Sequence, residues 1–317
     1  MPVLRGKLRA FHARNPTIFY NLPCRFFALV LYFYEITERT ENAMRTLYLS
    51  DLDGTLLNQK TELTSKTGSI LNGLMEQGLC FSIATARSRS SALPIIHKLN
   101  LTCPAIFHNG TFLMDPGTGE ILSAELFSPG QRQTIRSLLN RHRLHPVCYA
   151  FLEGRERLSY RAGEQNEGME YYLHKRREDP RMRECCSEEE LYDGEIYYFT
   201  CIGSREELSP VYEEVRRLKG FRCVFQQELY RPEYWLEIMP ENASKAHGME
   251  KLKELLPCER VVVFGDALND LPMFKAADEA YAVANAAEEL KQAATGIIGS
   301  NEEDGVADWL LNRLLQG

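Results

Sequence analysis

The sequence predicts an α/β fold in which a parallel sheet is interrupted by a second, α+β domain. From Met44 onward, short β-rich apolar runs alternate with amphipathic helical segments, the pattern of the strand–helix–strand units that build parallel sheets. Between residues 128 and 240 this regular alternation is lost, and after Pro240 it returns. We therefore expect residues 44–127 and 241–317 to form one core and residues 128–240 to form a separate, inserted domain.

In the first half of the core, apolar periodicity defines each element. Residues 47–51 form a short strand, and residues 64–77 form a helix with one apolar face and Gly78 after its end. We further predict a strand at 79–84, a helix that includes Leu93 and Ile96, a strand at 105–108, and a hairpin of residues 112–114 and 121–122. Pro94 fits the second helix only within its first turn, because proline has no amide proton to donate.

The same reasoning applies to the insert and to the second half of the core. In the insert we predict strands at 197–202, 222–225 and 235–238, and helices at 130–142 and 206–219. Residues 153–190 are dense in charges of both signs, which is more typical of a solvated face or loop than of a phosphate-binding patch. After the insert we predict a helix at 244–256, strands at 260–264 and 280–284, and helices at 286–294 and 303–315.

The composition is that of a globular protein. The chain has 317 residues, of which 44% are hydrophobic and 26% charged, enough to bury a sizeable core. Its net charge of −7 gives no reason to expect nucleic acid or an anionic membrane as a partner. The nine cysteines include no Cys-x-x-Cys pair, so we expect small buried thiols in a reducing cytoplasm rather than a zinc site or a disulfide framework.

The N-terminal 43 residues differ from the rest of the chain. A basic stretch precedes nine uninterrupted apolar or aromatic residues at 26–34, a run too short to span a membrane as a helix. Glu35, Glu38 and Glu41 follow where a secretory signal would have small cleavage-site residues. We interpret residues 1–43 as an appendage outside the working fold, with a weakly membrane-associated extension as the alternative.

Two carboxylates end the first predicted strand. Asp51 and Asp53 are two residues apart and are followed by Gly54 and Thr55. One carboxylate at such a position can attack a substrate while the other transfers a proton, which is the arrangement that covalent catalysis requires. Aspartate and glycine are also ordinary loop residues, so this pattern becomes specific only together with others.

A second acidic cluster follows the strand predicted at 260–264. Asp266, Asn269 and Asp270 lie on one strand-to-helix turn, and the carboxyl ends of parallel strands share one edge of the sheet. With Asp51, this places three carboxylates together, where they would repel one another unless a cation were present. Oxygen ligands favour Mg²⁺, although aspartates at such a turn can also cap the following helix.

Lys245 and Thr85 complete the polar set. Lys245 is expected at a helix start, where the free amides and its ammonium group would both attract a phosphate; a solvated surface lysine is the alternative. Thr85 follows the second strand, where a hydroxyl and turn amides can hold a phosphoryl oxygen.

Taken in order, these motifs resemble those of the haloacid dehalogenase (HAD) superfamily. Within it, the Cof-type branch (subclass IIB) is the most similar, because of the following segments: Ser244-Lys245, the run from Gly265 to Met273, Ala282-Val-Ala-Asn-Ala286 and Asn301-Glu-Glu-Asp-Gly-Val306. The resemblance covers residues 46–317 and implies a Rossmann-like parallel-sheet core with an inserted α+β cap domain that selects the substrate.

The resemblance also implies roles for the motif residues. Asp51 would be the nucleophile, Asp53 the general acid and base, and Thr85 and Lys245 would hold the phosphoryl group. The metal would be Mg²⁺, bound by the acidic set Asp51, Asp53, Asp266 and Asp270. The implied substrate-binding residues are Thr85, Arg87, Asn109, Gly110, Lys245 and Asn269. In the insert, Tyr230, Arg231 and Trp235 would contact substrate, although aromatic clusters are more often core.

One departure concerns the turn after the second strand. The family commonly has Thr-Gly-Arg where this chain has Thr85-Ala86-Arg87, so the turn must accept a Cβ atom. We expect a small effect.

The function implied is that of a cytoplasmic, Mg²⁺-dependent phosphatase. Its substrates would be small phosphomonoesters, such as a sugar phosphate, a nucleotide, flavin mononucleotide or pyridoxal phosphate, and its partners would include neither nucleic acid nor a stably bound membrane. The alternatives are a phosphomutase or phosphotransferase using the same aspartyl-phosphate, and a metabolite-sensing protein with vestigial activity.

Overall fold

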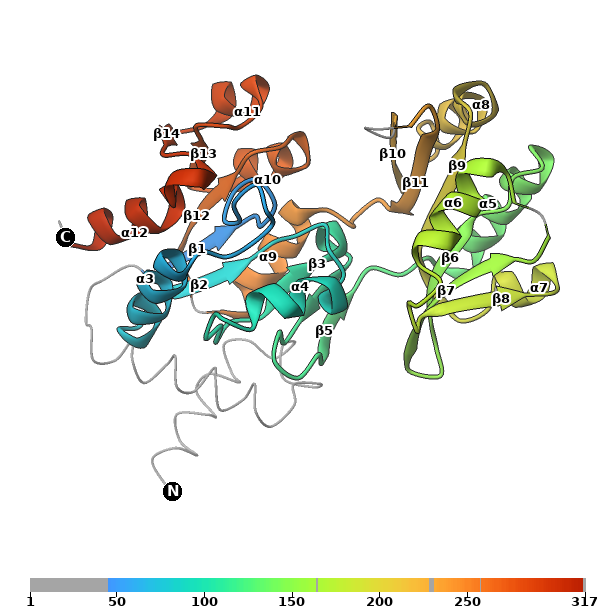
Figure 1. The fold of residues 1–317 in the computed structure, drawn as a ribbon. Coiled ribbons are helices and arrows are strands. Elements are labelled where there is room, and N and C mark those ends of the chain that lie inside the picture. Colours follow the sequence, from blue (N-terminus) through green and yellow to red (C-terminus); the bar gives the residue numbers. More distant parts are fainter. Residues whose placement is uncertain (1–44, 164, 228–230, 257, 316–317) are drawn as a thin grey trace, which may run out of the picture. The chain divides into compact units, whose positions relative to one another are not determined.

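The computed structural model describes residues 45–163, 165–227, 231–256 and 258–315. It divides into two compact units, here called the core unit (up to Ser123 and from Lys245 onward) and the inserted unit (Ala124–Ser244) (Figure 1). The domain predicted at 128–240 lies inside the inserted unit. The appendage predicted at 1–43 lies outside the described residues.

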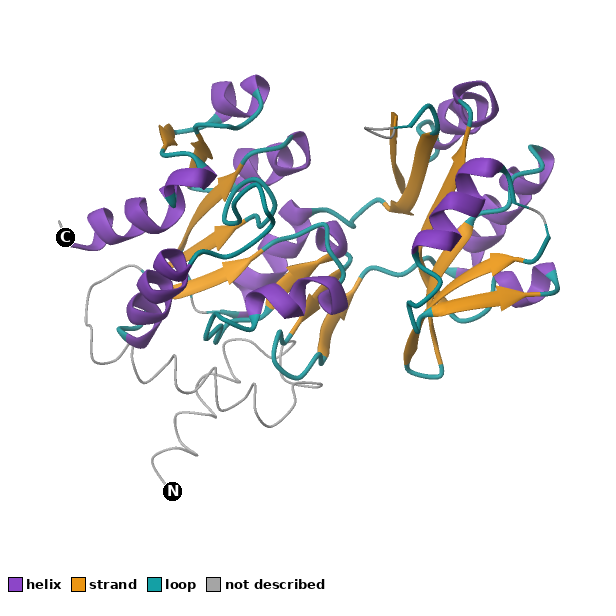
Figure 2. Ribbon diagram, viewed as in Figure 1, coloured by secondary structure: helices purple, strands orange, loops and turns teal. Residues whose placement is uncertain are grey.

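The core unit contains a five-stranded sheet in the order β14-β13-β12-β1-β2. Its strands are labelled in Figure 1 and drawn in orange in Figure 2. All four neighbouring pairs are parallel, which confirms the predicted parallel sheet. Its strands are β1 (Thr46–Ser50), β2 (Cys80–Ile83), β12 (Arg260–Gly265), β13 (Glu279–Val283) and β14 (Gly296–Ile298). Strand β1 is an inner strand, since it pairs with β2 on one side and with β12 on the other, and its apolar side chains are buried. The predicted nucleophile strand is therefore flanked on both sides.

A second, three-stranded sheet continues from the first. It consists of β3 (Ala105–Phe107), β4 (Phe112–Met114) and β5 (Ile121–Ala124) in that order. A single parallel bridge between Ala84 and Ile106 joins β2 to β3. The end of β2 and the turn after β3 are thereby brought close to each other, which matters for the site described below.

The helices of the core unit follow the predicted periodicity, with one exception. They are α3 (Ser65–Glu76), α4 (Arg89–Ile96), α9 (Lys245–Leu255), α10 (Leu271–Ala276), α11 (Glu288–Ala293) and α12 (Gly305–Leu315). The expectation that Pro94 lies in the first turn is wrong, because it is the sixth residue of α4. The helix ends two residues later, so the missing amide interrupts only its last turn.

The inserted unit has a six-stranded sheet in the order β10-β11-β9-β6-β7-β8. Neighbouring strands are antiparallel except for β7 and β8. The strands are β6 (Val147–Leu152), β7 (Arg155–Arg161), β8 (Met182–Cys185), β9 (Glu195–Gly203), β10 (Phe221–Gln227) and β11 (Tyr234–Pro240). The helices are α5 (Pro129–Arg141), α6 (Glu167–Lys175), α7 (Glu188–Leu191) and α8 (Arg205–Val215).

Both faces of the six-stranded sheet are covered by side chains of the helices of the inserted unit. Alternate residues of β9 point to opposite faces: Phe199 and Cys201 pack with α5 and α8, while Ile202 packs with Tyr172 of α6. Regular structure extends further than predicted, because the charged residues 153–190 include β7, α6, β8 and α7. Among the described residues, no helix is both long and apolar enough to cross a membrane.

Candidate active site

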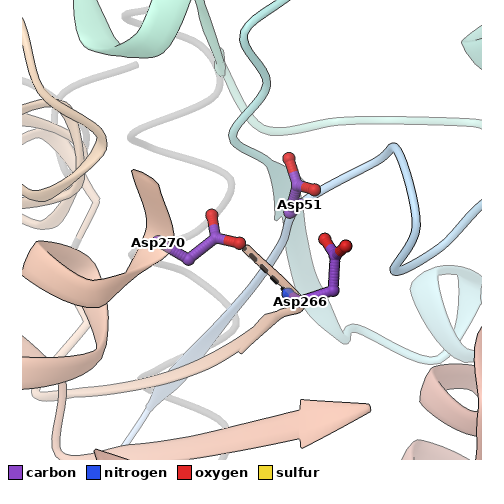
Figure 3. Close-up of side chains that lie close together, drawn as sticks. All are labelled: Asp51, Asp266 and Asp270. Carbon is purple, nitrogen blue, oxygen red and sulfur yellow. Dashed lines mark hydrogen bonds between the residues drawn. The ribbon is translucent and has the colours of Figure 1, made fainter. Parts of the chain in front are cut away.

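Three aspartates converge at the carboxyl edge of the core sheet. Asp51 directly follows β1 and Asp266 directly follows β12, and these two strands are adjacent. The amide of Asp51 donates to the carbonyl of Phe264 (3.0 Å), which extends the strand pairing to the site itself. Asp270 reaches the same place from the start of α10, and Figure 3 shows the three carboxylates around one space.

The carboxylates of Asp51, Asp266 and Asp270 are close enough to share one ligand. Each offers an oxygen within 4.8 Å of the others. Asp51 is 5% exposed and Asp270 is fully buried, whereas Asp266 is half-buried. A buried group of acids of this kind is electrostatically unfavourable unless positive charge offsets it.

Lys245 supplies part of that charge. It is the first residue of α9 and is 1% exposed, so it is not the solvated surface lysine of the alternative interpretation. Its Nζ donates to Oδ1 of Asp51 (2.5 Å) and to Oδ1 of Asp270 (2.7 Å). One ammonium group thus bridges two buried carboxylates.

The pKa values reflect this imbalance of charge. Burial raises the pKa of Asp51 to about 8, with Lys245 opposing the rise and Asp270 and Asp266 adding to it. Burial also raises the pKa of Asp266. For Lys245, burial would lower the pKa, but the carboxylates of Asp51 and Asp270 outweigh it and raise the pKa to about 12. The site therefore has less positive charge, from Lys245, than its three carboxylates need for balance.

Local backbone features fix the carboxylate positions. Gly54 has a φ of +77°, and a Cβ atom there would overlap the carboxylate of Asp266. At Gly265, a Cβ atom would lie 2.6 Å from Oδ2 of Asp270. That same Oδ2 accepts from the amides of Asp266 (3.1 Å) and Ala267 (3.2 Å), so Asp270 is held by its own turn. The close approach of these acids needs glycine at both positions.

Asp53 lies outside the three-aspartate group among the described residues. Its two oxygens accept from Nε (2.7 Å) and Nη2 (2.6 Å) of Arg87, forming a bidentate ion pair. The Asp53 side chain is 43% exposed, whereas Asp51 and Asp270 of the three-aspartate group are buried. Asp53, predicted both as acid–base and as metal ligand, is thus brought to Arg87 rather than to Asp266 and Asp270.

The turn after β2 presents Thr85 and Arg87. Thr85 is fully buried, and its Oγ1 accepts from the amide of Arg87 (3.1 Å). Ala86 is exposed, so its Cβ atom is accommodated as expected. The amide of Asn109 donates to the carbonyl of Thr85 (3.0 Å), which joins this turn to the one after β3.

The turn after β3 carries the predicted Asn109 and Gly110. His108, Asn109 and Gly110 all have positive φ values, of 49°, 55° and 99°. Left-handed backbone costs free energy for residues other than glycine, although asparagine and histidine adopt it more readily than most, so the surroundings of this turn must hold it. Asn269 contributes to that hold, since its Nδ2 donates to Oδ1 of Asn109 (3.1 Å).

Two residues at the site were not among the predicted site residues. Oγ1 of Thr55 donates to Oδ1 of Asp266 (2.9 Å) and orients that carboxylate. Nδ2 of Asn285 donates to the carbonyl of Gly54 (2.7 Å) and supports the loop after β1. Both belong to motifs noted in the sequence, but the pattern assigned no contact to either residue.

The donor set fits a hard divalent cation. Asp51, Asp266 and Asp270 offer only oxygen atoms, and one lysine leaves their charge incompletely balanced. Oxygen-only, acidic sites suit Mg²⁺ or Ca²⁺ rather than softer metals. These three residues could therefore hold a divalent metal ion.

Comparison with known proteins adds an independent observation. Residues 48–310 match the haloacid dehalogenase-like hydrolase family. A 5-amino-6-(5-phospho-D-ribitylamino)uracil phosphatase of Bacillus subtilis is 24% identical over 286 residues, which cover 84% of this chain and 97% of that protein. A pyridoxal phosphate phosphatase of Escherichia coli is 26% identical over 285 residues, which cover 84% and 97%. The solved structure of a haloacid dehalogenase-like hydrolase from Bacteroides thetaiotaomicron matches with a TM-score of 0.66 at 24% identity, covering 84% of this chain and 98% of that one.

Proposed function

Because the chain belongs to the haloacid dehalogenase-like hydrolases, in their Cof-type subclass IIB branch, and is a phosphoric monoester hydrolase, we propose that it hydrolyses small phosphomonoesters through an aspartyl-phosphate on Asp51. The observation that carries this proposal is the pair of contacts from Lys245 to Asp51 and Asp270 at the edge of the sheet. A buried carboxylate held there by a cation is positioned to act as a nucleophile.

In the first step, Asp51 attacks phosphorus. Lys245 contacts Oδ1 of Asp51, which leaves Oδ2 for the new P–O bond. As the ester P–O bond breaks, its electron pair goes to the leaving oxygen, which takes a proton from Asp53. The buried ammonium of Lys245 and the hydroxyl of Thr85 bind phosphoryl oxygens, so the charge that develops in transfer is met by groups already in place.

In the second step, Asp53 acts as a base. It removes a proton from water, whose oxygen attacks the aspartyl-phosphate and releases phosphate and free Asp51. Arg87 holds both oxygens of Asp53 in the structure. We assign Arg87 to substrate binding as well, since a phosphoryl oxygen can replace one carboxylate oxygen on its guanidinium and free Asp53 for proton transfer.

The proposed cofactor is Mg²⁺, held by Asp51, Asp266 and Asp270. When bound, it would supply positive charge to the phosphoryl group during transfer. Thr55 and the amides of Asp266 and Ala267 orient these carboxylates beforehand. Asn269 and Asn109 would contact the substrate or its water network beside them.

The proposed substrates are small phosphorylated metabolites. The two relatives described above act on a phosphorylated ribitylaminouracil and on pyridoxal phosphate, both small phosphomonoesters. We propose that the inserted unit is the cap that chooses among such esters. In its support, Arg231 and Trp235 line one pocket of that unit, of about 170 Å³, whereas the third expected contact, Tyr230, lies outside the described residues.

Phosphate release from a panel of phosphomonoesters with Mg²⁺ tests the proposal. Wild type should release phosphate, and Asp51→Asn, which removes the nucleophile at nearly constant volume, should not. Asp308→Asn, on the exposed side of α12, is the matched control and should retain activity. Release by folded Asp51→Asn, or none from the folded, metal-loaded wild type on any ester, would contradict the proposal.

A further inference from the structure

Three cysteines of the core unit meet at the edge of the sheet opposite the carboxylates. Cys80 begins β2, Cys103 lies two residues before β3, and Cys258 lies two residues before β12. These are the amino ends of strands whose carboxyl ends carry Thr85, the Asn109 turn and Asp266. The proposed phosphatase chemistry uses none of these thiols.

The three sulfurs form a short array with Cys80 in the middle. Its Sγ lies 3.5 Å from Sγ of Cys103 and 3.6 Å from Sγ of Cys258. Within the described chain, the two outer sulfurs make no hydrogen bond to each other. In a closed metal cage all three sulfurs would approach one another. Here the two outer thiols, Cys103 and Cys258, each contact only the thiol of Cys80 among the three.

Exposure and charge distinguish the two outer thiols. Cys103 is fully buried, whereas Cys258 is 8% exposed. The pKa of Cys258 is lowered by its hydrogen bond with Cys80; burial opposes this decrease, and the positive charges of Arg45 and Lys253 add to it. The thiolate is the form of cysteine that reacts with peroxides, and nearby cations favour it.

We propose that Cys258 and Cys80 form a peroxide-oxidisable thiol pair, in which Cys258 is oxidised first and Cys80 resolves it to a disulfide. The thiolate of Cys258 attacks one oxygen of hydrogen peroxide, the O–O bond breaks, and the products are a sulfenic acid and, after protonation, water. The sulfur of Cys80 then attacks the sulfenic sulfur, the S–O bond breaks, and the hydroxyl leaves as water with the thiol proton of Cys80. Two thiols lose two electrons in total, and one peroxide gains them.

The cross-link would join the strands on either side of β1. Strands β2 and β12 both pair with β1, so the disulfide would fasten its two neighbours at their amino ends. It would also join positions 178 residues apart, on either side of the whole inserted unit. Because the carboxylates lie at the other end of these strands, the site geometry is not directly involved.

Peptide mapping after peroxide treatment tests the pair. The full-length protein is treated with hydrogen peroxide, free thiols are blocked, and tryptic peptides are analysed without reduction. We expect a Cys80–Cys258 linked peptide that has lost two hydrogens and separates with dithiothreitol. No linked peptide, or a Cys80–Cys103 link in its place, would overturn the proposal.

Two variants make the order of events testable. In Cys80→Ser, the sulfenic acid on Cys258 has no resolving thiol, so dimedone should label Cys258 in this variant and much less in wild type. In Cys103→Ser, the Cys80–Cys258 link should still form to at least half the wild-type extent. Dimedone on Cys103 instead of Cys258 in Cys80→Ser, or loss of the link in folded Cys103→Ser, would contradict the assigned roles.

Discussion

In the core unit, charged side chains are buried together, whereas in the inserted unit they pair near the surface. Asp51, Asp270 and Lys245 are all at most 5% exposed. In the described part of the inserted unit, the buried side chains that carry polar atoms are neutral, namely Ser159, Thr200 and the tyrosines Tyr172, Tyr197 and Tyr198. Its ion pairs are at least partly exposed: Arg181 and Asp179 each keep about a fifth of the side chain exposed, and Arg141 and Glu214 keep more.

We propose that the difference separates residues that serve the proposed chemistry from residues that serve stability. Burying three carboxylates with one lysine costs free energy, and a fold tolerates such a group where it performs a function. Partly exposed ion pairs cost little and contribute little. Substitutions should therefore have large effects at the core site and graded, smaller effects in the inserted unit.

The largest effect is expected for Lys245→Ala. The change leaves Asp51 and Asp270 buried without their shared cation, so we expect a loss of about 3–5 kcal/mol in the free energy of unfolding without metal. Phosphatase activity should fall by at least about 100-fold, since a group that meets the transferring phosphoryl charge is lost. Urea unfolding and phosphate release measure both. Lys275→Ala, at an exposed position of α10, should change neither.

Addition of Mg²⁺ should stabilise the protein through the core unit. At a 100-fold excess over its dissociation constant, a ligand that binds only the folded state adds about 2.7 kcal/mol. Differential scanning calorimetry should show a higher Tm with Mg²⁺ in wild type and in Asp308→Asn, but not in Asp266→Asn. An equal shift in all three proteins would mean that the ion does not use this site. Exhaustive chelation should also abolish phosphate release.

In the inserted unit, Arg181→Gln should have an intermediate effect that depends on pH. Arg181 binds Asp179 and Glu156, and we expect its loss to cost about 2 kcal/mol at neutral pH. Hydrogen bonds from Arg181 lower the pKa of Asp179 below its usual 3.8, so this stabilisation is present above that value and is lost as the pH falls through the lowered pKa. Melting curves from pH 7 to pH 3 should show the two proteins converging at low pH. A constant difference would exclude this linkage, and Arg177→Gln, an exposed neighbour, is the control.

The smallest effect is expected for Glu213→Gln on α8. Glu213 contacts Arg216 (3.1 Å) and Arg217 (3.5 Å), but all three side chains are largely in solvent. Exposed pairs of this kind are screened by salt and cost side-chain entropy. The Tm should be unchanged within the reproducibility of the measurement, at low and at physiological salt. A clear decrease would show that the contrast between the two units is too simple.

Much of the core unit could be predicted from the sequence, because its signals are local. The apolar runs of β1 and β12 and the acids after them lie within a few residues of each other, and the parallel-sheet rule then places Asp51 beside Asp266. The helix predicted at 64–77 is α3, Ser65–Glu76. The predicted helix start at Lys245 is the start of α9, and the structure brings this lysine to Asp51.

What could not be predicted depends on partners distant in the sequence. No local pattern reveals that Arg87 will hold Asp53, or that Cys80 and Cys258 will meet. In residues 153–190 the charges concealed regular structure, because charged side chains of the strands have partners nearby, as between Glu156 of β7 and Arg181, which directly precedes β8. Reasoning from apolar periodicity treats such charged residues as solvated, and it therefore predicts too few helices and strands in the inserted unit.

The pairing of β1 with β12 also determines when the site can form during synthesis. Leu47 pairs with Val261, and the intervening chain contains the entire inserted unit. As the chain leaves the ribosome, β1 can pair with β2 on one side, but the inserted unit is complete while β12, its neighbour on the other side, is still missing. Contacts so distant in sequence form slowly, and an unpaired apolar strand is prone to aggregate. Asp51 must therefore wait for more than two hundred further residues before Asp266 exists, since Thr55 of the same loop already precedes Asp266 by 211 positions. The nascent chain thus passes through a stage in which the acidic group is incomplete and one side of β1 is open.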